Sequence, residues 1–381
     1  MDFDLTEEQR MFRSTVREFA EAEIAPQVEE LDQIGEFPYD IQKKMADLGL
    51  FGLPFPEEYG GADADLVTYA LSVEEISRVS AALGITISAH TSLGAMLVYL
   101  NGTEEQKQEW LIPMAQGKIL GAFGLTEPEA GSDASATKTT AVLDGDEWVI
   151  NGTKCFISNS GTEISKMVTI TAVTGDRAGK KEISNIIVPH GTPGFTVSPP
   201  YRKMGWHISD THELSFSDCR VPAGNLLGDR GAGLKTFLRV LDCGRIGVAA
   251  LSVGLAQACL DEAVKYARQR RQFGQPIGKF QAVSFRCSDM LVEVELARLA
   301  TLRAAWLYDQ GKPHSREASI AKLFASETAM RAASTAVQIH GGYGYIEDYP
   351  VCRYFRDAKI LEIGEGTSEV QRLVLARSLG L

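Results

Sequence analysis

The stretch Gly124-Leu125-Thr126-Glu127-Pro128-Glu129-Ala130-Gly131-Ser132-Asp133 marks the point at which the sequence changes character. Before it, apolar side chains recur at helical spacing, and after it come short β-branched and aromatic runs separated by turn residues. Its glycines and proline favour an irregular backbone that a ligand can approach closely, while Thr126 and Ser132 offer hydroxyl groups. A linker built from turn residues explains the same stretch, and on this evidence alone the linker is the commoner case.

The zone before this stretch, residues 1–118, predicts an N-terminal helical domain. Capping-box patterns at Thr6 and Thr103 mark two helix starts, and apolar spacing predicts a further helix over residues 66–79.

Two further zones follow, the first with strand patterns and the second with helical patterns. Residues 119–229 predict a middle β domain and residues 230–381 a C-terminal helical domain, so the expected fold class is mainly α with a central β domain. The strands are expected around 148–150, 168–173, 186–188 and 195–197, and the long helices over 237–268, 283–308 and 315–340.

Composition excludes several classes of function. The net charge of −12 argues against nucleic acid or an anionic membrane as the main partner. The longest apolar stretches, such as 246–255, are too short for membrane insertion, and no targeting segment is visible, so we expect a cytoplasmic protein. The six cysteines form no C-x-x-C pair and the six histidines no H-E-x-x-H motif, so we expect no metal site.

A second glycine-rich segment, Gln338-Ile339-His340-Gly341-Gly342-Tyr343-Gly344-Tyr345, follows the last long helical pattern. Its glycines permit positive φ and expose backbone N–H groups to an anion such as a pyrophosphate. The segment is not a dinucleotide fingerprint, because no strand precedes it and the spacing differs. A helix C-cap followed by a turn remains the simpler interpretation.

The C-terminal stretch contains the strongest candidate for a catalytic base. Glu365 stands between two glycines, just ahead of a helix that Thr367 caps, and Val370, Leu373 and Val374 are expected on the buried face of that helix. A carboxylate with little side-chain cover is open to a ligand. The helix N-terminus favours its anion and burial opposes it, which suits a general base. Glu362 and Glu369 are rivals for the role.

One predicted long helix contains glycines in its interior. Gly244 and Gly247 each cost that helix about 1 kcal/mol relative to alanine, so either a close helix neighbour or a ligand chain should need the space. Arg268, Arg270 and Arg271 end the helix with a cationic cluster, which the helix dipole alone would also favour.

Taken together, these motifs strongly resemble the acyl-CoA dehydrogenase family over the whole chain. Residues 124–136 look like its first signature and residues 338–357 like its second. The resemblance implies a helical domain, a β-barrel-like domain and a four-helix domain, in a homotetramer with FAD at a subunit interface. It also implies dehydrogenation of an acyl-CoA at its α and β carbons, with an electron-transfer flavoprotein reoxidising the flavin.

The resemblance assigns roles to individual residues. Glu365 matches the base that removes the α-proton while flavin N5 accepts the β-hydride. The substrate contacts it implies are Ser132, Asp242, Arg245 and Gly366. The FAD contacts it implies are Leu125, Thr126, Ser132, Phe156, Ser158, Thr367 and Glu369, with Arg270, Phe273, Gln281, Gln338, Gly341 and Gly342 donated by the neighbouring subunit.

Departures within the family bear on the substrate. Gly244 stands where the isovaleryl and long-chain branches carry their glutamate, so the chain looks like the short-chain, butyryl-CoA type, and Gly84 in place of an arginine disfavours dicarboxylates. Gly364 replaces an aromatic residue, which would widen the pocket towards branched or cyclic acyl groups. Trp206 and His207 also depart from the family pattern.

Two other functions would use the same residues. In a non-redox isomerase or hydratase of acyl-CoA, Glu365 would only shuttle protons, and in a catalytically silent acyl-CoA-binding protein the fold would persist without chemistry. Only the dehydrogenase requires a tightly bound yellow flavin.

Overall fold

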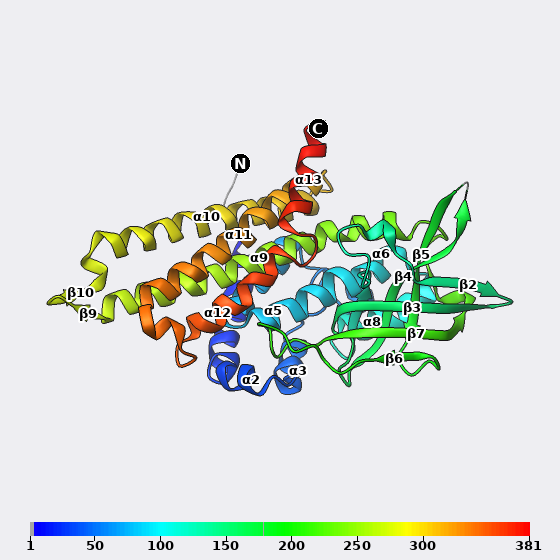
Figure 1. The fold of residues 1–381 in the computed structure, drawn as a ribbon, viewed down its shortest axis with the longest axis horizontal. Coiled ribbons are helices and arrows are strands. Elements are labelled where there is room, and N and C mark those ends of the chain that lie inside the picture. Colours follow the sequence, from blue (N-terminus) through cyan, green and yellow to red (C-terminus); the bar gives the residue numbers. More distant parts are fainter. Residues whose placement is uncertain (1–3, 178) are drawn as a thin grey trace.

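The computed structural model describes residues 4–177 and 179–381. Figure 1 shows the β-sheet at one end of the molecule, the long C-terminal helices extending to the other, and the N-terminal helices packed against both. The order of helices, sheet and helices along the chain confirms the predicted mainly α fold with a central β domain.

The N-terminal part is helical, as predicted. Both capping boxes are present; at the first, Gln9 N donates to Thr6 Oγ1 at 3.1 Å and Thr6 N donates to Gln9 Oε1 at 3.0 Å. The helices are α1 (Glu7–Phe19), α2 (Val28–Ile34), α3 (Tyr39–Asp47), α4 (Leu66–Val79), α5 (Ala81–Ser88), α6 (Met96–Asn101), α7 (Glu104–Gln106) and α8 (Ile112–Ala115).

The middle part is an eight-stranded sheet in the order β6-β7-β3-β2-β4-β5-β8, with β1 pairing in parallel with β4. Alternation along the strands buries one set of side chains in a separate apolar cluster that includes Trp148, Ile150 and Ile186. The strands are β1 (Leu120–Gly124), β2 (Thr140–Asp144), β3 (Glu147–Ser158), β4 (Ser165–Arg177), β5 (Lys180–Pro189), β6 (Phe195–Val197), β7 (Thr211–Pro222) and β8 (Leu226–Leu227).

The C-terminal part begins with the longest helix of the described chain, α9, whose 37 residues extend about 55 Å. A small hairpin separates it from the next helix. The elements are α9 (Gly233–Gln269), β9 (Arg271–Gln272), β10 (Gln275–Pro276), α10 (Gln281–Asp309), α11 (Ser315–His340), α12 (Pro350–Ala358) and α13 (Ser368–Ser378).

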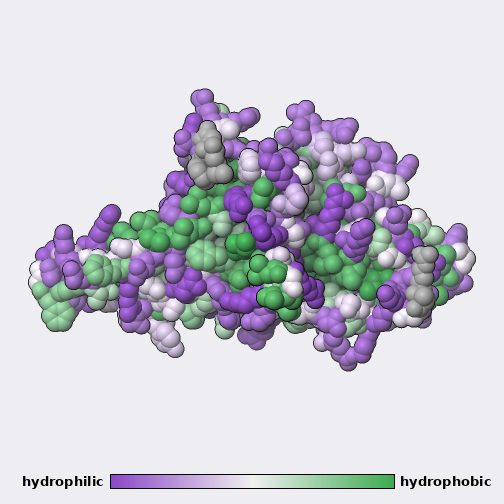
Figure 2. Space-filling model, turned by 90° about the horizontal axis from the view of Figure 1, so that it is seen from above, coloured by the Kyte–Doolittle hydropathy of each residue, from purple (hydrophilic) through white to green (hydrophobic). Residues whose placement is uncertain are grey.

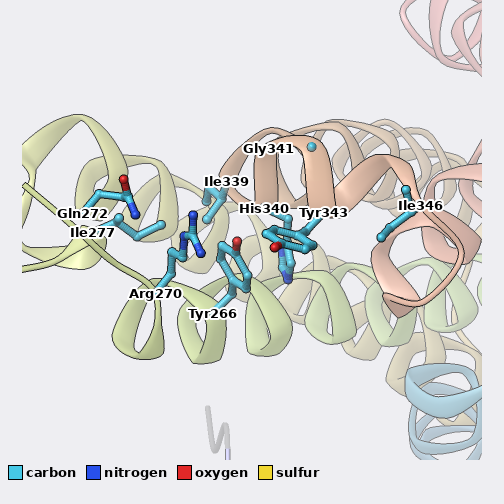
Figure 3. A pocket seen from close by; sticks show the side chains of 10 residues that line it. Tyr266, Arg270, Gln272, Ile277, Ile339, His340, Gly341, Tyr343 and Ile346 are labelled. Atoms are coloured by element: carbon cyan, nitrogen blue, oxygen red, sulfur yellow. The ribbon is translucent and has the colours of Figure 1, made fainter.

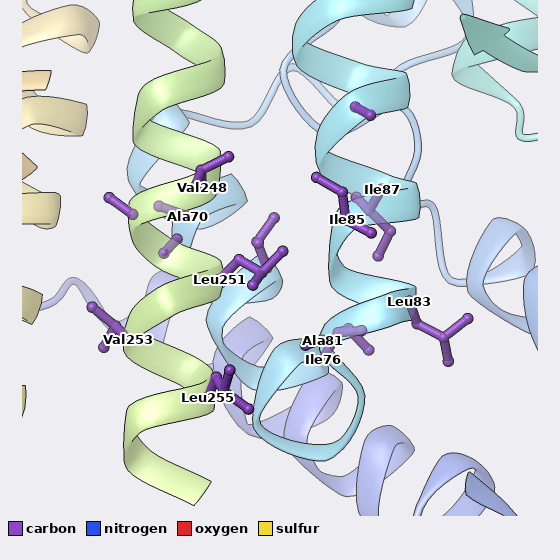
Figure 4. Close-up of a cluster of buried hydrophobic side chains, with 14 of the residues drawn as sticks. Ala70, Ile76, Ala81, Leu83, Ile85, Ile87, Val248, Leu251, Val253 and Leu255 are labelled. Carbon is purple, nitrogen blue, oxygen red and sulfur yellow. The ribbon is translucent and has the colours of Figure 1, made fainter. Parts of the chain in front are cut away.

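Helix α9 is the central element of the helical core. Leu251 and Leu255 are fully buried against α4 and α5, and Figure 4 shows Leu251 facing Ile85 and Leu255 on the side of Ile76 and Ala81. Two helical stretches, Ala81–Asn101 and α9, are long and apolar enough to cross a membrane, but 94% of each scanned window is buried inside the protein. Both are therefore placed as core helices, since their apolar faces are already covered.

The last helix corrects one prediction. Leu373, expected on the buried face of α13, is 57% exposed, whereas Ser368 and Gln371 are the residues that α13 buries.

Large apolar side chains are also exposed along α10, and Figure 2 shows hydrophobic surface on this side of the molecule. Those on α10 are Phe285, Leu291, Val292, Leu296, Leu299 and Trp306.

Candidate active site

Glu365 lies in the short connection between a 3₁₀ turn (Lys359–Glu362) and α13. Its φ of 52° is left-handed, a conformation that costs a non-glycine residue about 1–2 kcal/mol. Gly366 follows with a φ of 93°, and Thr367 then caps α13, as predicted, by accepting a hydrogen bond from Val370 N at 3.3 Å. The backbone therefore holds Glu365 in a strained turn at the start of a helix.

The Glu365 carboxylate lies against Gly244 of α9. A Cβ atom added at position 244 would stand 2.0 Å from Glu365 Oε2 and 3.4 Å from Leu93 Cδ2, so the glycine provides the space that the carboxylate occupies. Both carboxylate oxygens are buried, and neither has a hydrogen-bond partner among residues 4–177 and 179–381. The two flanking glycines give this carboxylate little side-chain cover of their own, and α9 and Leu93 supply the cover.

Burial without hydrogen bonds sets the electrostatics of this carboxylate. It raises the pKa of Glu365 to about 7, while the positive charges of Lys322 and Arg245 oppose part of that rise. A carboxylate that titrates near neutral pH can hold or release a proton under physiological conditions, as a general base must.

Lys322 is a residue of this site that sequence reasoning missed. It is fully buried in α11, its Nζ donates to the carbonyl of Gly366 at 2.7 Å, and burial lowers its pKa to about 8. A signal was available: position 322 lies four residues after Ala318 and three before Ala325, both fully buried, so a lysine stands on the buried face of a helix.

The predicted substrate residues on α9 also lie in this neighbourhood. Arg245 Nη1 donates to Asp242 Oδ1 at 2.8 Å and to Ser319 Oγ at 3.4 Å, and Ser315 Oγ donates to the same Asp242 oxygen at 3.0 Å. The buried Nε of Arg245 has no partner in the described part of the chain. The structure thus brings Asp242, Arg245, Gly366 and Glu365 together around one turn of α9.

The first signature is held in place by a buried ion pair that the sequence did not reveal. Lys154 is fully buried and its Nζ donates to Glu127 Oε1 at 2.7 Å and to the Leu125 carbonyl at 3.1 Å. Glu127 also accepts hydrogen bonds from the backbone of Lys138 and Thr139. A buried charge is tolerated where it is paired and hydrogen-bonded, and here the pair fixes the path of the loop after β1.

The predicted flavin residues of the middle domain lie close to this loop. Cys155 N donates to the Thr126 carbonyl at 2.9 Å, next to Phe156, which has a φ of 61° and is 66% exposed. The pairing of β3 with β7 shifts register between Lys154 and Ile157, and this irregularity turns the Phe156 ring outwards. Ser158 follows half-buried at the end of β3, while Ser132 is exposed.

Three of the predicted residues, Arg270, Gly341 and Gly342, line a cleft of about 460 Å³ between the end of α9 and the end of α11. Figure 3 shows Arg270 and Tyr343 on its wall, with the Arg270 guanidinium 5.6 Å from the ring centre of Tyr343. Gly341 has a φ of 63°, and a Cβ atom there or at Gly342 would meet nothing within 4 Å.

The remaining predicted residues border the same region. Gln338 and Gln281 are exposed at the end of α11 and the start of α10. Phe273, at the tip of the β9–β10 hairpin, is 92% exposed, which is unusual for a large aromatic side chain of a monomer.

The Glu365 site (the first group) and the Arg270 cleft (the second group) are far apart within one chain. Arg270 is 26 residues beyond Gly244, which corresponds to about 39 Å along α9. Figure 1 shows the hairpin β9–β10 and the sheet at opposite ends of the molecule. The second group therefore cannot complete the first group's site in the same chain.

The residues that depart from the family pattern have defined surroundings. Trp206, with a φ of 53°, donates its backbone N–H to Asp357 Oδ1 at 2.7 Å. His207 Nδ1 lies 3.1 Å from the Asp32 carbonyl, in a polar cleft of about 330 Å³. At Gly364, a Cβ atom would meet only the Ile360 carbonyl, at 3.5 Å, so this position borders open space.

Metal ligands do not converge anywhere in the described residues, where no group of three His, Cys, Asp or Glu side chains could hold an ion. The six cysteines are free thiols, and Cys155, Cys219, Cys243 and Cys259 are buried.

Family models match nearly the whole chain. They are described as the acyl-CoA dehydrogenase N-terminal domain (residues 6–118), middle domain (residues 122–219) and C-terminal domain (residues 231–380). The chain belongs to the acyl-CoA dehydrogenase family, which confirms the resemblance, and it is an oxidoreductase with FAD as its cofactor.

Individual relatives point to the short-chain branch. A probable acyl-CoA dehydrogenase of Bacillus subtilis is 56% identical over 100% of both chains. A short-chain specific acyl-CoA dehydrogenase of Clostridium acetobutylicum is 47% identical over 99% of both.

Solved structures agree. The butyryl-CoA dehydrogenase of Megasphaera elsdenii superposes with a TM-score of 0.97 at 45% identity over 100% of both chains. A chain in a structure described as the electron transferring flavoprotein of Acidaminococcus fermentans has a TM-score of 0.96 at 49% identity, covering 100% of this chain and 99% of that one.

Proposed function

We propose that this protein converts a short-chain acyl-CoA to the trans-2-enoyl-CoA, with Glu365 removing the α-proton. The observation that carries the proposal is the buried, unpaired carboxylate of Glu365, held in a left-handed turn against Gly244. A carboxylate that has lost its water without gaining a partner is poised to take a proton from a ligand placed beside it.

The site residues then have separate tasks. Glu365, with a pKa of about 7, is partly ionised at neutral pH and accepts the α-proton. Gly366 and the Asp242–Arg245 pair lie where they can orient the thioester and the CoA. Bound FAD supplies the acceptor for the hydride that leaves the β carbon. Leu93 and α9 exclude water from the carboxylate.

The acyl group we propose has roughly four to six carbons, because the chain is similar to short-chain and butyryl-CoA dehydrogenases. Each methylene that fits contributes about 0.8 kcal/mol, so preference should fall sharply where the pocket ends. A dicarboxylate is disfavoured because Gly84 stands where a dicarboxylate-specific relative would carry an arginine, so this position supplies no positive charge. The open space at Gly364 leaves room for a branched or cyclic acyl group.

The residues of the chain fit a flavin that two subunits share. We propose that the exposed Phe156 ring covers the isoalloxazine beside Leu125, Thr126, Ser132 and Ser158, with Thr367 and Glu369 at the other end of the cofactor. The cleft lined by Arg270, Gly341 and Gly342 would contact the FAD of a neighbouring subunit, because it cannot reach the Glu365 site in its own chain. We propose that Phe273, Gln281 and Gln338, which lie outside the cleft, contact the same FAD.

Assembly and partners belong to the same proposal. The apolar side chains exposed along α10 favour a subunit interface, and we propose a homotetramer. The electron acceptor would be an electron-transfer flavoprotein, and the location the cytoplasm.

The test is purification followed by a substrate panel. We expect about one FAD per chain, and oxidation of acyl-CoA esters with an artificial electron acceptor that is fastest at four to six carbons. A colourless protein that cannot be reconstituted with FAD, or one fastest on twelve or more carbons, would contradict the proposal.

A further inference from the structure

In the part of the chain that the structure describes, the ammonium of Lys322 donates its hydrogen bond to the loop that carries Glu365. Lys322 is fully buried near the middle of α11, and its Nζ donates to the backbone carbonyl of Gly366 at 2.7 Å. Burying a cation costs several kcal/mol of desolvation unless it is compensated. An apolar residue would pack on this face of the helix without that cost, so the lysine calls for another explanation.

The carbonyl that Lys322 binds belongs to Gly366, the residue after Glu365, so a group that holds this carbonyl also holds the Glu365 turn. Gln371, also fully buried, donates its Nε2 to the same Gly366 carbonyl at 3.0 Å and to the Glu365 carbonyl at 3.3 Å. Glu365 and Gly366 are two consecutive residues with positive φ. Because such a turn is strained for Glu365, it persists only where its surroundings hold it, and two buried donors on one carbonyl do so.

Charge adds a second effect. The charged groups that influence Lys322 are Glu365, Glu362 and Glu369 from the C-terminal segment and Arg245 from α9. Lys322 is the foremost of the two cations that lower the pKa of Glu365 against the effect of burial. The other, Arg245, already donates to Asp242 and Ser319.

We infer that Lys322 is a positioning residue for the dehydrogenation: its ammonium group holds the Glu365–Gly366 turn in its left-handed conformation and supplies the main positive charge facing the base. This inference rests on the proposed role of Glu365. Lys322 and Gln371 both bind the Gly366 carbonyl, but their contributions differ. Lys322 contributes a hydrogen bond and a positive charge, whereas Gln371 contributes hydrogen bonds only.

The matched pair Lys322→Met and Gln371→Leu tests the inference in the FAD-loaded protein. Methionine keeps the length of the side chain, and replacing a buried charge with an apolar group is often neutral for stability. The measurements are FAD content, the dissociation constant for a non-oxidisable butyryl-CoA thioether, and the pH dependence of flavin bleaching by butyryl-CoA.

For Lys322→Met we expect a bleaching rate at pH 7 reduced about tenfold and a pH midpoint moved upwards by on the order of one unit, because loss of the cation favours the protonated base. FAD content and thioether affinity should stay within about threefold. Gln371→Leu should slow bleaching without moving the midpoint. If Lys322→Met lowers FAD content through misfolding, Lys322→Arg should restore the pH midpoint of the parent.

Two results would overturn the inference: a Lys322→Met protein with the rate and midpoint of the parent, or one that loses rate with the midpoint unmoved. Failure of the proposed function looks different. In that case the parent protein itself would not bleach with any acyl-CoA, whatever residue stands at position 322.

Discussion

Two sites lie along α9, one at Gly244 towards its N-terminal end and one at Arg270 at its C-terminal end, and their surroundings are opposite in character. Around Gly244, the Glu365 carboxylate is buried, unpaired within the described chain, and surrounded by residues from α9, α11 and the C-terminal turn. About 39 Å further along the helix, the Arg270 cleft is lined by a guanidinium group together with aliphatic and aromatic side chains. Phe273, close to it in the chain, is almost fully exposed.

This difference distinguishes a site that folding completes from one that it leaves incomplete. Burial within one chain has already raised the pKa of Glu365 to about 7, so the base is tuned before any ligand arrives. The Arg270 cleft gains its partners only from a ligand and a second subunit. Changes at the first end should therefore alter chemistry at constant cofactor content, and changes at the second should alter cofactor content and assembly.

The largest expected effect comes from Glu365→Gln, which keeps size and polarity but cannot accept the proton. The rate of flavin bleaching by butyryl-CoA should fall by at least about 10²–10⁴-fold, with FAD content unchanged. Stopped-flow absorbance measures the rate. Glu362→Gln, three residues away and paired with Lys359, is the control and should behave as the parent does. Bleaching of the Glu365→Gln protein at near the parent rate would place the base elsewhere.

Gly244→Ala should also damage only the first end. The new Cβ would overlap Glu365 Oε2, so the carboxylate must move, and a displacement of about 1 Å can cost about 10²-fold in rate. Gly224→Ala, where a Cβ meets nothing within 4 Å, is the matched control. Bleaching rate and FAD content are measured for both proteins. An alanine at 244 that leaves the rate intact would mean that the carboxylate acts from a different position.

Arg270→Ala tests the second end. If the guanidinium pairs with an FAD phosphate across a subunit interface, its loss should raise the dissociation constant for FAD about 10- to 100-fold and weaken the oligomer. Arg268→Ala, a neighbouring exposed arginine outside the cleft, should do neither. FAD titration and light scattering measure the two effects. A monodisperse, fully yellow Arg270→Ala protein would show that the cluster serves only the helix end.

The smallest effect is the pH dependence of the parent protein. Because Glu365 must be ionised to accept a proton and its pKa lies at about 7, the bleaching rate should rise about tenfold between pH 6 and pH 8 and then level off. Rapid mixing at saturating butyryl-CoA across this range gives the profile. A rate that is flat down to pH 5 would mean that Glu365 titrates like an exposed carboxylate.

Much of this protein could be predicted from local sequence signals. The capping boxes at Thr6 and Thr103, the helix over 66–79 and the Thr367 cap are short-range patterns, and each occurs as predicted. The class of fold follows from the order of helical and strand patterns. The position of Glu365 between two glycines made it a candidate base beside Glu362 and Glu369, and the resemblance to the family selected it among them.

The sequence alone could not show what surrounds those residues. That Gly244 makes room for the Glu365 carboxylate, and that Lys322 reaches the Gly366 carbonyl, depends on segments separated by 121 and 44 positions in the chain. The exposure of Leu373 was missed for the same reason, since helical periodicity shows which side chains share a face but not which face is covered. The amino-acid sequence determines which chemical groups are present and which short-range structures they favour. Burial, pairing and pKa are properties of the tertiary structure, because they depend on which distant groups displace water from a side chain.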